Sequence, residues 1–300
     1  MANPELRKML ARGEVFFAPA VWDPVTARLA RHLGFKALYV PGSGTGIAVG
    51  EGKSMTTLTQ TATVAERALE SVANELPMIV DVMSGFGNAV HIQLMVRTLE
   101  DAGVSAIHID DHVYPRHICV PGGRHHVVSL EQYQQRVEYA VKARKSRDFF
   151  IIARISAEGG ANARNDAVKR AHAALEVGAD AIFIAGMRPQ SNDMEYYRSQ
   201  IADVPMVTVP WSGSWHTNKE GELLSLEDYR GLGYQLILYQ RVIQPTLLAI
   251  RDVYQCVKDT GYLPEVPQGQ VARIEDLWWN LVGMKEKWAV EAATTENRHL

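Results

Sequence analysis

The fold of this chain is decided by two apolar runs, Pro77-Met-Ile-Val-Asp-Val-Met-Ser-Gly-Phe-Gly-Asn88 and Ala106-Ile-His-Ile-Asp-Asp-His-Val-Tyr-Pro-Arg116. Each run has the pattern of a buried strand that breaks into a loop. A helical pattern from Ala89 to Ala102 lies between them and is closed by Gly103. The order strand, helix, strand predicts the βαβ unit of a parallel sheet.

Acidic side chains stand where each run ends. Asp81 closes the first run, and Asp110 and Asp111 close the second. The carboxyl ends of neighbouring parallel strands converge on one crevice, so we expect these carboxylates to meet there. A buried aspartate is costly unless it binds something, and Mg²⁺ suits carboxylate oxygens. The alternative for Asp81 is a helix cap or a hydrogen bond to a neighbouring strand.

Only one of the two adjacent aspartates can face that crevice. Successive side chains of a strand point to opposite faces, so Asp110 and Asp111 must diverge. We expect the second of the pair to be structural, packing toward the helices or pairing with an arginine.

Eight apolar runs recur along the 300 residues, and each is followed by a helical pattern. They are continuously apolar, which is typical of strands buried on both faces. Eight βα units predict an α/β fold, a (β/α)8 TIM barrel over residues 1–260, with a doubly wound open sheet as the alternative. The runs are Val15–Ala20, Ala37–Val40, Met78–Val82, Ala106–Asp111, Phe149–Ile155, Ala181–Gly186, Met206–Pro210 and Leu236–Tyr239.

Residues 261–300 are predicted to form a C-terminal helical extension after a last barrel helix at Arg241–Asp259. A terminal helix is expected from Ile274 to Ala293. Its large apolar side chains need a partner surface, either the barrel itself or a second subunit. These side chains are Leu277, Trp278, Trp279, Leu281, Val282, Met284 and Trp288.

Composition narrows the class of protein. The formal net charge is -3 with no basic block, so neither nucleic acid nor an acidic membrane surface is indicated as a partner. Two cysteines give no disulfide framework and favour a reducing compartment. No apolar run is long enough to span a bilayer. We expect a cytoplasmic protein.

Two long loops follow predicted strand ends, where barrel loops carry function. The first, Pro41–Thr57, holds five glycines, which predict either an anion cradle of backbone N–H groups or a flexible lid. The second, His112–Val128, is rich in histidine and arginine. Such a loop can carry a general acid or base, although most of its side chains are expected to be solvated.

An arginine and two tryptophans complete the candidates. Arg154 ends the fifth run, and its planar fork suits a substrate carboxylate. The alternative is a structural ion pair with one of the aspartates, and both roles can coexist. Trp211 and Trp215 follow the seventh run, where they could line an apolar pocket or belong to the core.

Several motifs, in this order along the chain, resemble the isocitrate lyase/phosphoenolpyruvate mutase superfamily. The resemblance runs from about residue 5 to residue 260. It is carried by Val15-Phe-Phe-Ala-Pro-Ala-Val-Trp-Asp-Pro, Gly34-Phe-Lys-Ala-Leu-Tyr-Val-Pro-Gly, Asp81-Val-Met-Ser-Gly-Phe-Gly-Asn, Ile107-His-Ile-Asp-Asp-His, Ala153-Arg-Ile-Ser-Ala and Gly178-Ala-Asp-Ala-Ile-Phe.

The resemblance implies a barrel that forms homodimers or homotetramers, with the eighth helix exchanged between subunits. It implies Mg²⁺, or Mn²⁺ in its place, at the strand ends. It also implies 2-hydroxy or 2-oxo carboxylic acid substrates whose carbon–carbon bond is cleaved through a metal-stabilised enolate.

The chain departs from the family pattern at several site positions. The second aspartate of the third-strand motif is Met83, the serine after the second strand is Pro41, and the thiol of the mobile loop is Ile118, with Cys119 one position later. Together with Trp211 and Trp215, Met83 indicates a more apolar pocket and an altered substrate.

The sequence therefore predicts a carbon–carbon lyase or decarboxylase that depends on Mg²⁺. The alternatives are a hydrolase of the oxaloacetate type, a C–P bond enzyme, or a catalytically silent carboxylate-binding protein. The predicted metal ligands are Asp81 and Asp110. The predicted catalytic residues are His112, His117, Cys119 and Arg154. The predicted substrate-binding residues are Tyr39, Gly42, Ser43, Gly44, Asp81, Arg154 and Trp211.

Overall fold

The structure is a computed structural model. It describes residues 2–116, 126–156, 162–187, 192–201, 204–210, 217, 222–262, 264 and 268–294. No helix within these ranges is long and apolar enough to cross a membrane.

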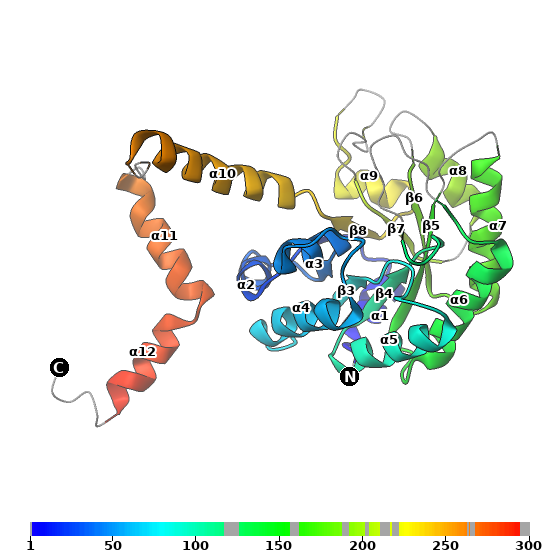
Figure 1. Ribbon diagram of the computed structural model, residues 1–300, viewed down its shortest axis with the longest axis horizontal. Helices are drawn as coiled ribbons and strands as arrows, with labels where there is room; N and C mark the ends of the chain where they lie inside the picture. Colours follow the sequence, from blue (N-terminus) through cyan, green and yellow to red (C-terminus); the bar gives the residue numbers. More distant parts are fainter. Residues whose placement is uncertain are drawn as a thin grey trace.

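Eight parallel strands form a barrel surrounded by helices (Figure 1). The strand order is β1-β8-β7-β6-β5-β4-β3-β2, and a bridge between Ala20 and Tyr39 brings β1 and β2 together. The predicted (β/α)8 barrel is therefore confirmed. The strands are β1 Phe16–Pro19, β2 Leu38–Val40, β3 Met78–Asp81, β4 Ala106–Ile109, β5 Phe150–Ser156, β6 Ala181–Ala185, β7 Met206–Thr208 and β8 Leu236–Tyr239.

Most helices surround the strands on the outside of the barrel. Helix α1 packs against the barrel interior, and the C-terminal helices extend away from the barrel. The helices are α1 Glu5–Ala11, α2 Pro24–His32, α3 Gly42–Val49, α4 Leu58–Ser71, α5 Ala89–Asp101, α6 Leu130–Ala143, α7 Ala163–Glu176, α8 Asp193–Gln200, α9 Leu226–Gly231, α10 Ile243–Thr260, α11 Gln268–Leu281 and α12 Met284–Ala293.

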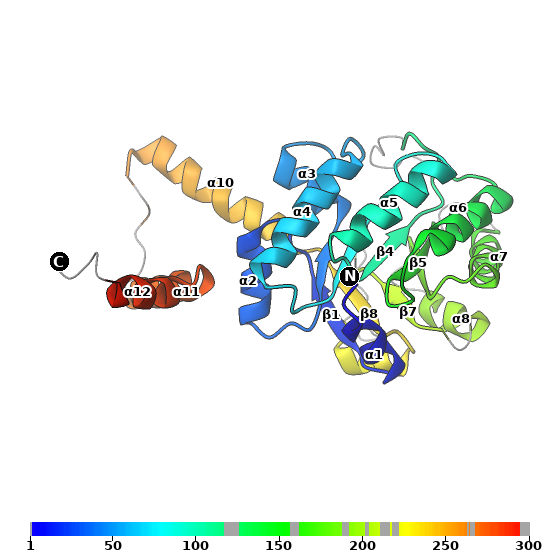
Figure 2. The same ribbon diagram turned by 90° about the horizontal axis from the view of Figure 1, so that it is seen from below.

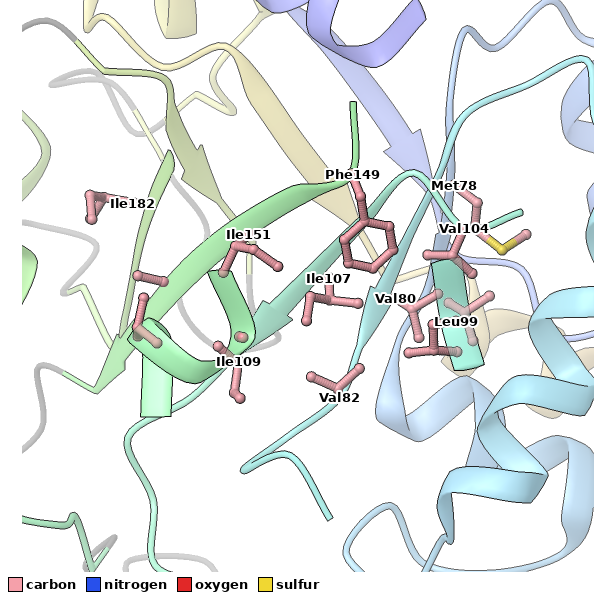
Figure 3. Packing of buried hydrophobic residues seen from close by; sticks show 14 of the residues in the cluster. Met78, Val80, Val82, Leu99, Val104, Ile107, Ile109, Phe149, Ile151 and Ile182 are labelled. Atoms are coloured by element: carbon pink, nitrogen blue, oxygen red, sulfur yellow. The ribbon is translucent and has the colours of Figure 1, made fainter. Parts of the chain in front are cut away.

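Two apolar clusters account for the continuously apolar strands. The outer cluster lies between the strands and the helices, where Val80 and Ile107 pack near Leu99 of α5 (Figure 3). The inner cluster fills the barrel, and α1 contributes Leu6 and Leu10 to it. Because both faces of each strand are buried, alternation is absent, as expected for a parallel barrel.

The glycine-rich segment after β2 differs from the expected loop. It forms α3, which ends where Gly50 adopts the left-handed conformation with φ 76°. Glycine is needed inside this helix because a Cβ on Gly46 would lie 2.5 Å from the carbonyl oxygen of Glu51. The loop 50–53 can therefore fold back against α3.

The C-terminal segment is helical, but the bounds of its helices differ from the single helix expected. Helix α10 extends away from the barrel. Figures 1 and 2 both show that α11 and α12 lie outside the barrel, on the side to which α10 extends. Ile243 is the only buried residue of α10, all of which is described. The expected helix Ile274–Ala293 is divided by a break at Gly283, which has φ 63°. Leu281 contacts the barrel helices, since its carbonyl accepts a hydrogen bond from Arg28 at 2.9 Å.

Glu100 ties α5 to the connection between α6 and β5. Its side chain is buried and accepts hydrogen bonds from the backbone N–H groups of Lys145 at 2.6 Å and Ser146 at 2.8 Å. Replacing Glu100 with alanine leaves both of these part-buried donors unpaired. We expect the free energy of unfolding in urea to fall by about 1–3 kcal/mol.

Asp101→Ala is the matched control, because Asp101 is exposed and makes an exposed ion pair with Lys145. Its effect should stay within about 0.5 kcal/mol. Equal effects of the two substitutions would contradict a buried structural role for Glu100.

Candidate active site

A cavity of about 100 Å³ opens at the carboxyl ends of the strands. Among the described residues, its charged lining consists of three cationic side chains, Lys53, Arg116 and Arg154, and one carboxylate, Asp81. The remaining lining residues are Tyr39, Ser43, Phe183, Val209, Gln240, Ile243 and Gln244. A volume below the range of typical drug-sized pockets indicates a small ligand.

Asp81 ends β3 and is 7% exposed. One carboxylate oxygen accepts a hydrogen bond from the N–H of Met83 at 2.9 Å. The other lies 3.3 Å from the N–H of Gly42, at the start of α3, and 3.3 Å from Nη1 of Arg154. Burial raises the pKa of Asp81, but His108 and the Arg154 guanidinium outweigh it and lower that pKa overall.

Arg154 points into the barrel from β5, and its guanidinium lies 5.1 Å from the centre of the Phe183 ring. The side chain is 5% exposed, and its Nε has no hydrogen-bond partner. The predicted ion pair with an aspartate is confirmed. Arg154 also lines the cavity, so it is placed to hold a ligand.

Asp110 lies deeper and is fully buried. Its oxygens lie 2.9 Å from Nη1 of Arg116, 3.0 Å from Nδ1 of His112 and 3.1 Å from the hydroxyl of Ser84. Burial raises the pKa of Asp110, but the Arg116 guanidinium and His112 lower it well below its usual range. Asp110 therefore stays ionised and holds Arg116 at the cavity.

Asp111 points the other way, as expected for the second of two adjacent residues. It accepts a hydrogen bond from the N–H of Ser156 at 3.1 Å and lies 3.6 Å from Nη1 of Arg170 on α7. Burial and the charge of Asp110 raise the pKa of Asp111. Its predicted structural role, pairing with an arginine, is confirmed.

A buried histidine lies beside Asp81 in the barrel register. His108 of β4 is fully buried, with Nε2 3.0 Å from the hydroxyl of Tyr39 and Nδ1 3.6 Å from a carboxylate oxygen of Asp81. Burial lowers the pKa of His108 to about 4, so the ring is neutral at neutral pH. Burial also raises the pKa of Tyr39 well above its usual range, so Tyr39 keeps its proton.

Of the other predicted site residues, some line the cavity and others do not. Tyr39 and Ser43 line the cavity, and their role in substrate binding stays a prediction. Gly42 and Gly44 do not line it: the N–H of Gly42 is directed to Asp81, and a Cβ on Gly44 would meet the Pro41 ring at 3.1 Å. The anion cradled at the start of α3 is thus the carboxylate of Asp81.

The predicted proton-transfer residues are mostly outside the described part of the chain. His112 is buried, with Nε2 2.8 Å from the hydroxyl of Ser156, and it does not line the cavity. His117, Cys119 and Trp211 lie outside the described residues.

The sequence patterns did not indicate Lys53 as a site residue, and they assigned no specific role to Arg116. Lys53 stands in the glycine-rich segment after β2, and Arg116 follows the strand that ends at Asp110. A single lysine or arginine in a loop at the strand ends is a weak signal. Nothing in the pattern shows that Lys53 and Arg116 line the same cavity.

The donor set does not fit the Mg²⁺ implied by the resemblance. No group of three or more His, Cys, Asp or Glu side chains within the described ranges could hold a metal ion. Both predicted ligands, Asp81 and Asp110, already pair with arginines. Mg²⁺ is usually held by one or two carboxylates together with water, but here both carboxylates are taken by arginines and the cationic side chains in the cavity lining oppose a further cation.

A larger cavity, of about 590 Å³, lies at the opposite end of the barrel. Its lining includes Arg7 of α1, Val15 before β1 and Gln235 before β8. In barrels of this type the amino-terminal face serves stability, whereas the carboxyl-terminal face carries chemistry. The smaller cationic cavity is therefore the candidate site.

The fold and the site define an α/β-barrel protein with a cationic pocket at the carboxyl ends of its strands. Residues 6–253 match the family model described as phosphoenolpyruvate phosphomutase. The chain belongs to the isocitrate lyase/phosphoenolpyruvate mutase superfamily.

This chain is similar to two curated relatives and to a solved structure. Phosphonopyruvate hydrolase of Variovorax sp. strain Pal2 is 31% identical, over 88% of this chain and 89% of that protein. 2,3-Dimethylmalate lyase of Eubacterium barkeri is 30% identical, over 85% and 86%. A crystal structure of phosphonopyruvate hydrolase with oxalate and Mg²⁺ has a TM-score of 0.79 and 26% identity, over 98% of this chain and 99% of that one. These relatives are enzymes, and the similarity supports the prediction that this chain is an enzyme as well.

The buried His108 predicts a pH-dependent stability. The unfolded chain binds a proton at this ring below its ordinary pKa of 6.5, whereas the folded chain binds it only below about 4. Stability is therefore complete above that ordinary pKa and is lost as the pH falls through this window. Between pH 7 and pH 5 this group should remove about 2 kcal/mol from the free energy of unfolding.

Urea unfolding at both pH values measures the loss. His108→Gln lacks the titrating ring, so its free energy of unfolding should vary less over the same pH interval. An equally steep loss in this variant would assign the pH dependence to other groups.

Proposed function

We propose that this protein cleaves a carbon–carbon bond of a small 2-oxo or 2-hydroxy carboxylic acid through an enolate. The observation that carries the proposal is the cavity at the strand ends, whose described lining includes three cationic side chains, Lys53, Arg116 and Arg154, and the carboxylate of Asp81. A cavity of about 100 Å³ with this charge suits a small carboxylate anion. The lyase among the relatives supports the same reaction class.

Arg154 is proposed to bind the carboxylate of the substrate. Its planar fork matches a carboxylate, and its Nε–H is not used by the protein. The pair with Asp81 fixes the direction of the guanidinium before the ligand arrives. Preorganised donors of this kind stabilise charge that develops during a reaction.

Tyr39 is proposed to donate a hydrogen bond to the enolate oxygen, while its own oxygen accepts a hydrogen bond from the Nε2–H of His108. The hydroxyl keeps its proton because burial raises its pKa, and the residue lines the cavity. Phe183, Val209 and Ile243 offer an apolar wall for a substituent of the substrate. His117 and Cys119 stay proposed proton-transfer residues on the sequence pattern alone.

Hydrolysis of a C–P or C–C bond is the second candidate. The similarity to phosphonopyruvate hydrolase, which extends over most of both chains, favours it. The products separate the two reactions. Phosphate released from phosphonopyruvate, or oxalate with acetate from oxaloacetate, would identify a hydrolase, whereas a lyase releases a 2-oxo acid from a 2-hydroxy acid.

The substitution Arg154→Lys tests the proposal. It keeps the charge and the partner of Asp81 but removes the fork, so kcat/KM should fall roughly 10²- to 10³-fold on the acid that the wild type turns over. Turnover is followed by NMR across a panel of 2-oxo and 2-hydroxy acids.

Arg31→Met is the control, since Arg31 is exposed on α2 and pairs with Glu75. It should leave kcat/KM unchanged. A wild type that binds members of the panel but turns over none of them would instead support a silent carboxylate-binding protein.

We also propose that the chain forms a homodimer or homotetramer in which α10 contacts a second copy. The helix leaves its own barrel, and its apolar side chains Leu247, Ile250 and Tyr254 are 47%, 44% and 72% exposed. Their spacing places them on one side of the helix. A second copy of the barrel is the partner that could cover this side.

Light scattering on the full-length protein should give the mass of a dimer or a tetramer. Ile250→Glu should reduce that mass, because a charge in an apolar interface is costly. Lys258→Glu near the end of α10 alters the charge without touching these apolar residues. A monomeric wild type would refute the proposed oligomer.

A further inference from the structure

The carboxylates at the strand ends are already occupied by the protein's own donors. Each oxygen of Asp110 has two donors, with Ser84 and the N–H of His112 on one, and the His112 ring and Arg116 on the other. Asp81 is 7% exposed and contacts the N–H groups of Met83 and Gly42 as well as Arg154. Little oxygen capacity is left for a hard divalent cation.

Spare capacity lies with the cations instead. The Nε–H groups of Arg116 and Arg154 are buried and have no hydrogen-bond partner. Both side chains are at least nine-tenths buried, with 9% and 5% exposure. Buried donors without partners are uncommon in folded proteins, and they mark a place where a ligand can complete the network.

Lys53 is held at the same cavity by its backbone. The loop 50–53 rests on Gly46, where a Cβ would lie 3.2 Å from the N–H nitrogen of Lys53. The carbonyl of Lys53 accepts a hydrogen bond from the hydroxyl of Thr56 at 3.2 Å. The backbone of Lys53 is therefore fixed against α3, and the half-buried side chain lines the cavity.

We propose that Lys53, with Arg116 and Arg154, takes the place of a divalent cation, so that the cavity binds a dicarboxylate or enolate dianion without metal. The inference rests on the proposed function for its ligand class. Fixed ammonium and guanidinium groups supply positive charge where the anion sits and need no rearrangement when it binds. Lys53 lines this cavity together with Arg116 and Arg154, whose Nε–H groups have no partner, so one anion with several oxygens can contact all three side chains.

Oxalate binding to the full-length protein tests this inference. Calorimetric titration is done on protein freed of metal with EDTA, first in EDTA and then with excess Mg²⁺. We expect oxalate to bind in EDTA with a Kd that Mg²⁺ does not lower. Binding that requires Mg²⁺ would overturn the inference while leaving the proposed reaction class intact.

Substitutions at Lys53 make the test specific. Lys53→Met should raise the Kd for oxalate roughly tenfold or more in EDTA, as expected for the loss of one charged donor. Lys53→Arg should restore most of the affinity, because it returns the charge. Lys36→Met is the control. Lys36 is an exposed lysine just before β2, and it pairs with Glu14.

Circular dichroism and thermal unfolding show whether each variant is folded. If folded Lys53→Met binds oxalate as tightly as the wild type, Lys53 does not contribute to the anion site and the inference fails. If the wild type binds no oxalate with or without Mg²⁺, the inference also fails. The proposed function is judged separately, by turnover of the acid panel.

Discussion

Two buried ion pairs at the mouth of the barrel determine how the site is built. Asp81 pairs with Arg154, and Asp110 pairs with Arg116, with all four side chains at most 9% exposed. A buried charge is tolerated only when a partner and further hydrogen bonds compensate its desolvation. The start of α3, the turn after β3 and the residues after β4 all supply such hydrogen bonds. The local backbone and the charges therefore stabilise one another.

The parallel register makes these pairs possible. Asp81 lies beside His108, and Arg154 lies beside Phe183, in strands that all end at the same face. His108 fits beside Asp81 because its ring is neutral, so it adds no net charge to the barrel interior. Tyr39 bonds to that ring and reaches the cavity. The layer beneath the cavity is thus polar but nearly neutral, whereas the lining above it is positive.

The sequence predicted what depends on local periodicity and strand polarity. The eight strands and the divergence of Asp110 from Asp111 follow from short patterns read in order. The helix α3 was missed because its glycines resemble a loop. They are required instead by close approach, as at Gly46, where the loop 50–53 folds back. Contacts of that kind join segments that no local pattern connects.

The nature of the site was harder to predict, because a carboxylate that binds a metal and one that pairs with arginine have the same sequence signal. Asp81 and Asp110 were read as metal ligands from their position alone. What distinguishes the two cases is the residue that meets each carboxylate in space. For Asp110 that partner comes from the loop of its own strand, and for Asp81 it comes from β5. Only the second requires the folded barrel, and neither can be inferred from spacing.

A barrel of this class needs positive charge at the strand ends to hold a carboxylate substrate, and that charge can come from a bound cation or from side chains. A bound cation calls for a cluster of carboxylates, so that the empty site is negative and the loaded site is balanced. Side-chain cations call for the reverse, with few carboxylates and each of them paired. The described lining, with Lys53, Arg116 and Arg154 around Asp81, has the second arrangement. Its charge is present before any ligand arrives, which makes anion binding depend on the positions of these three side chains.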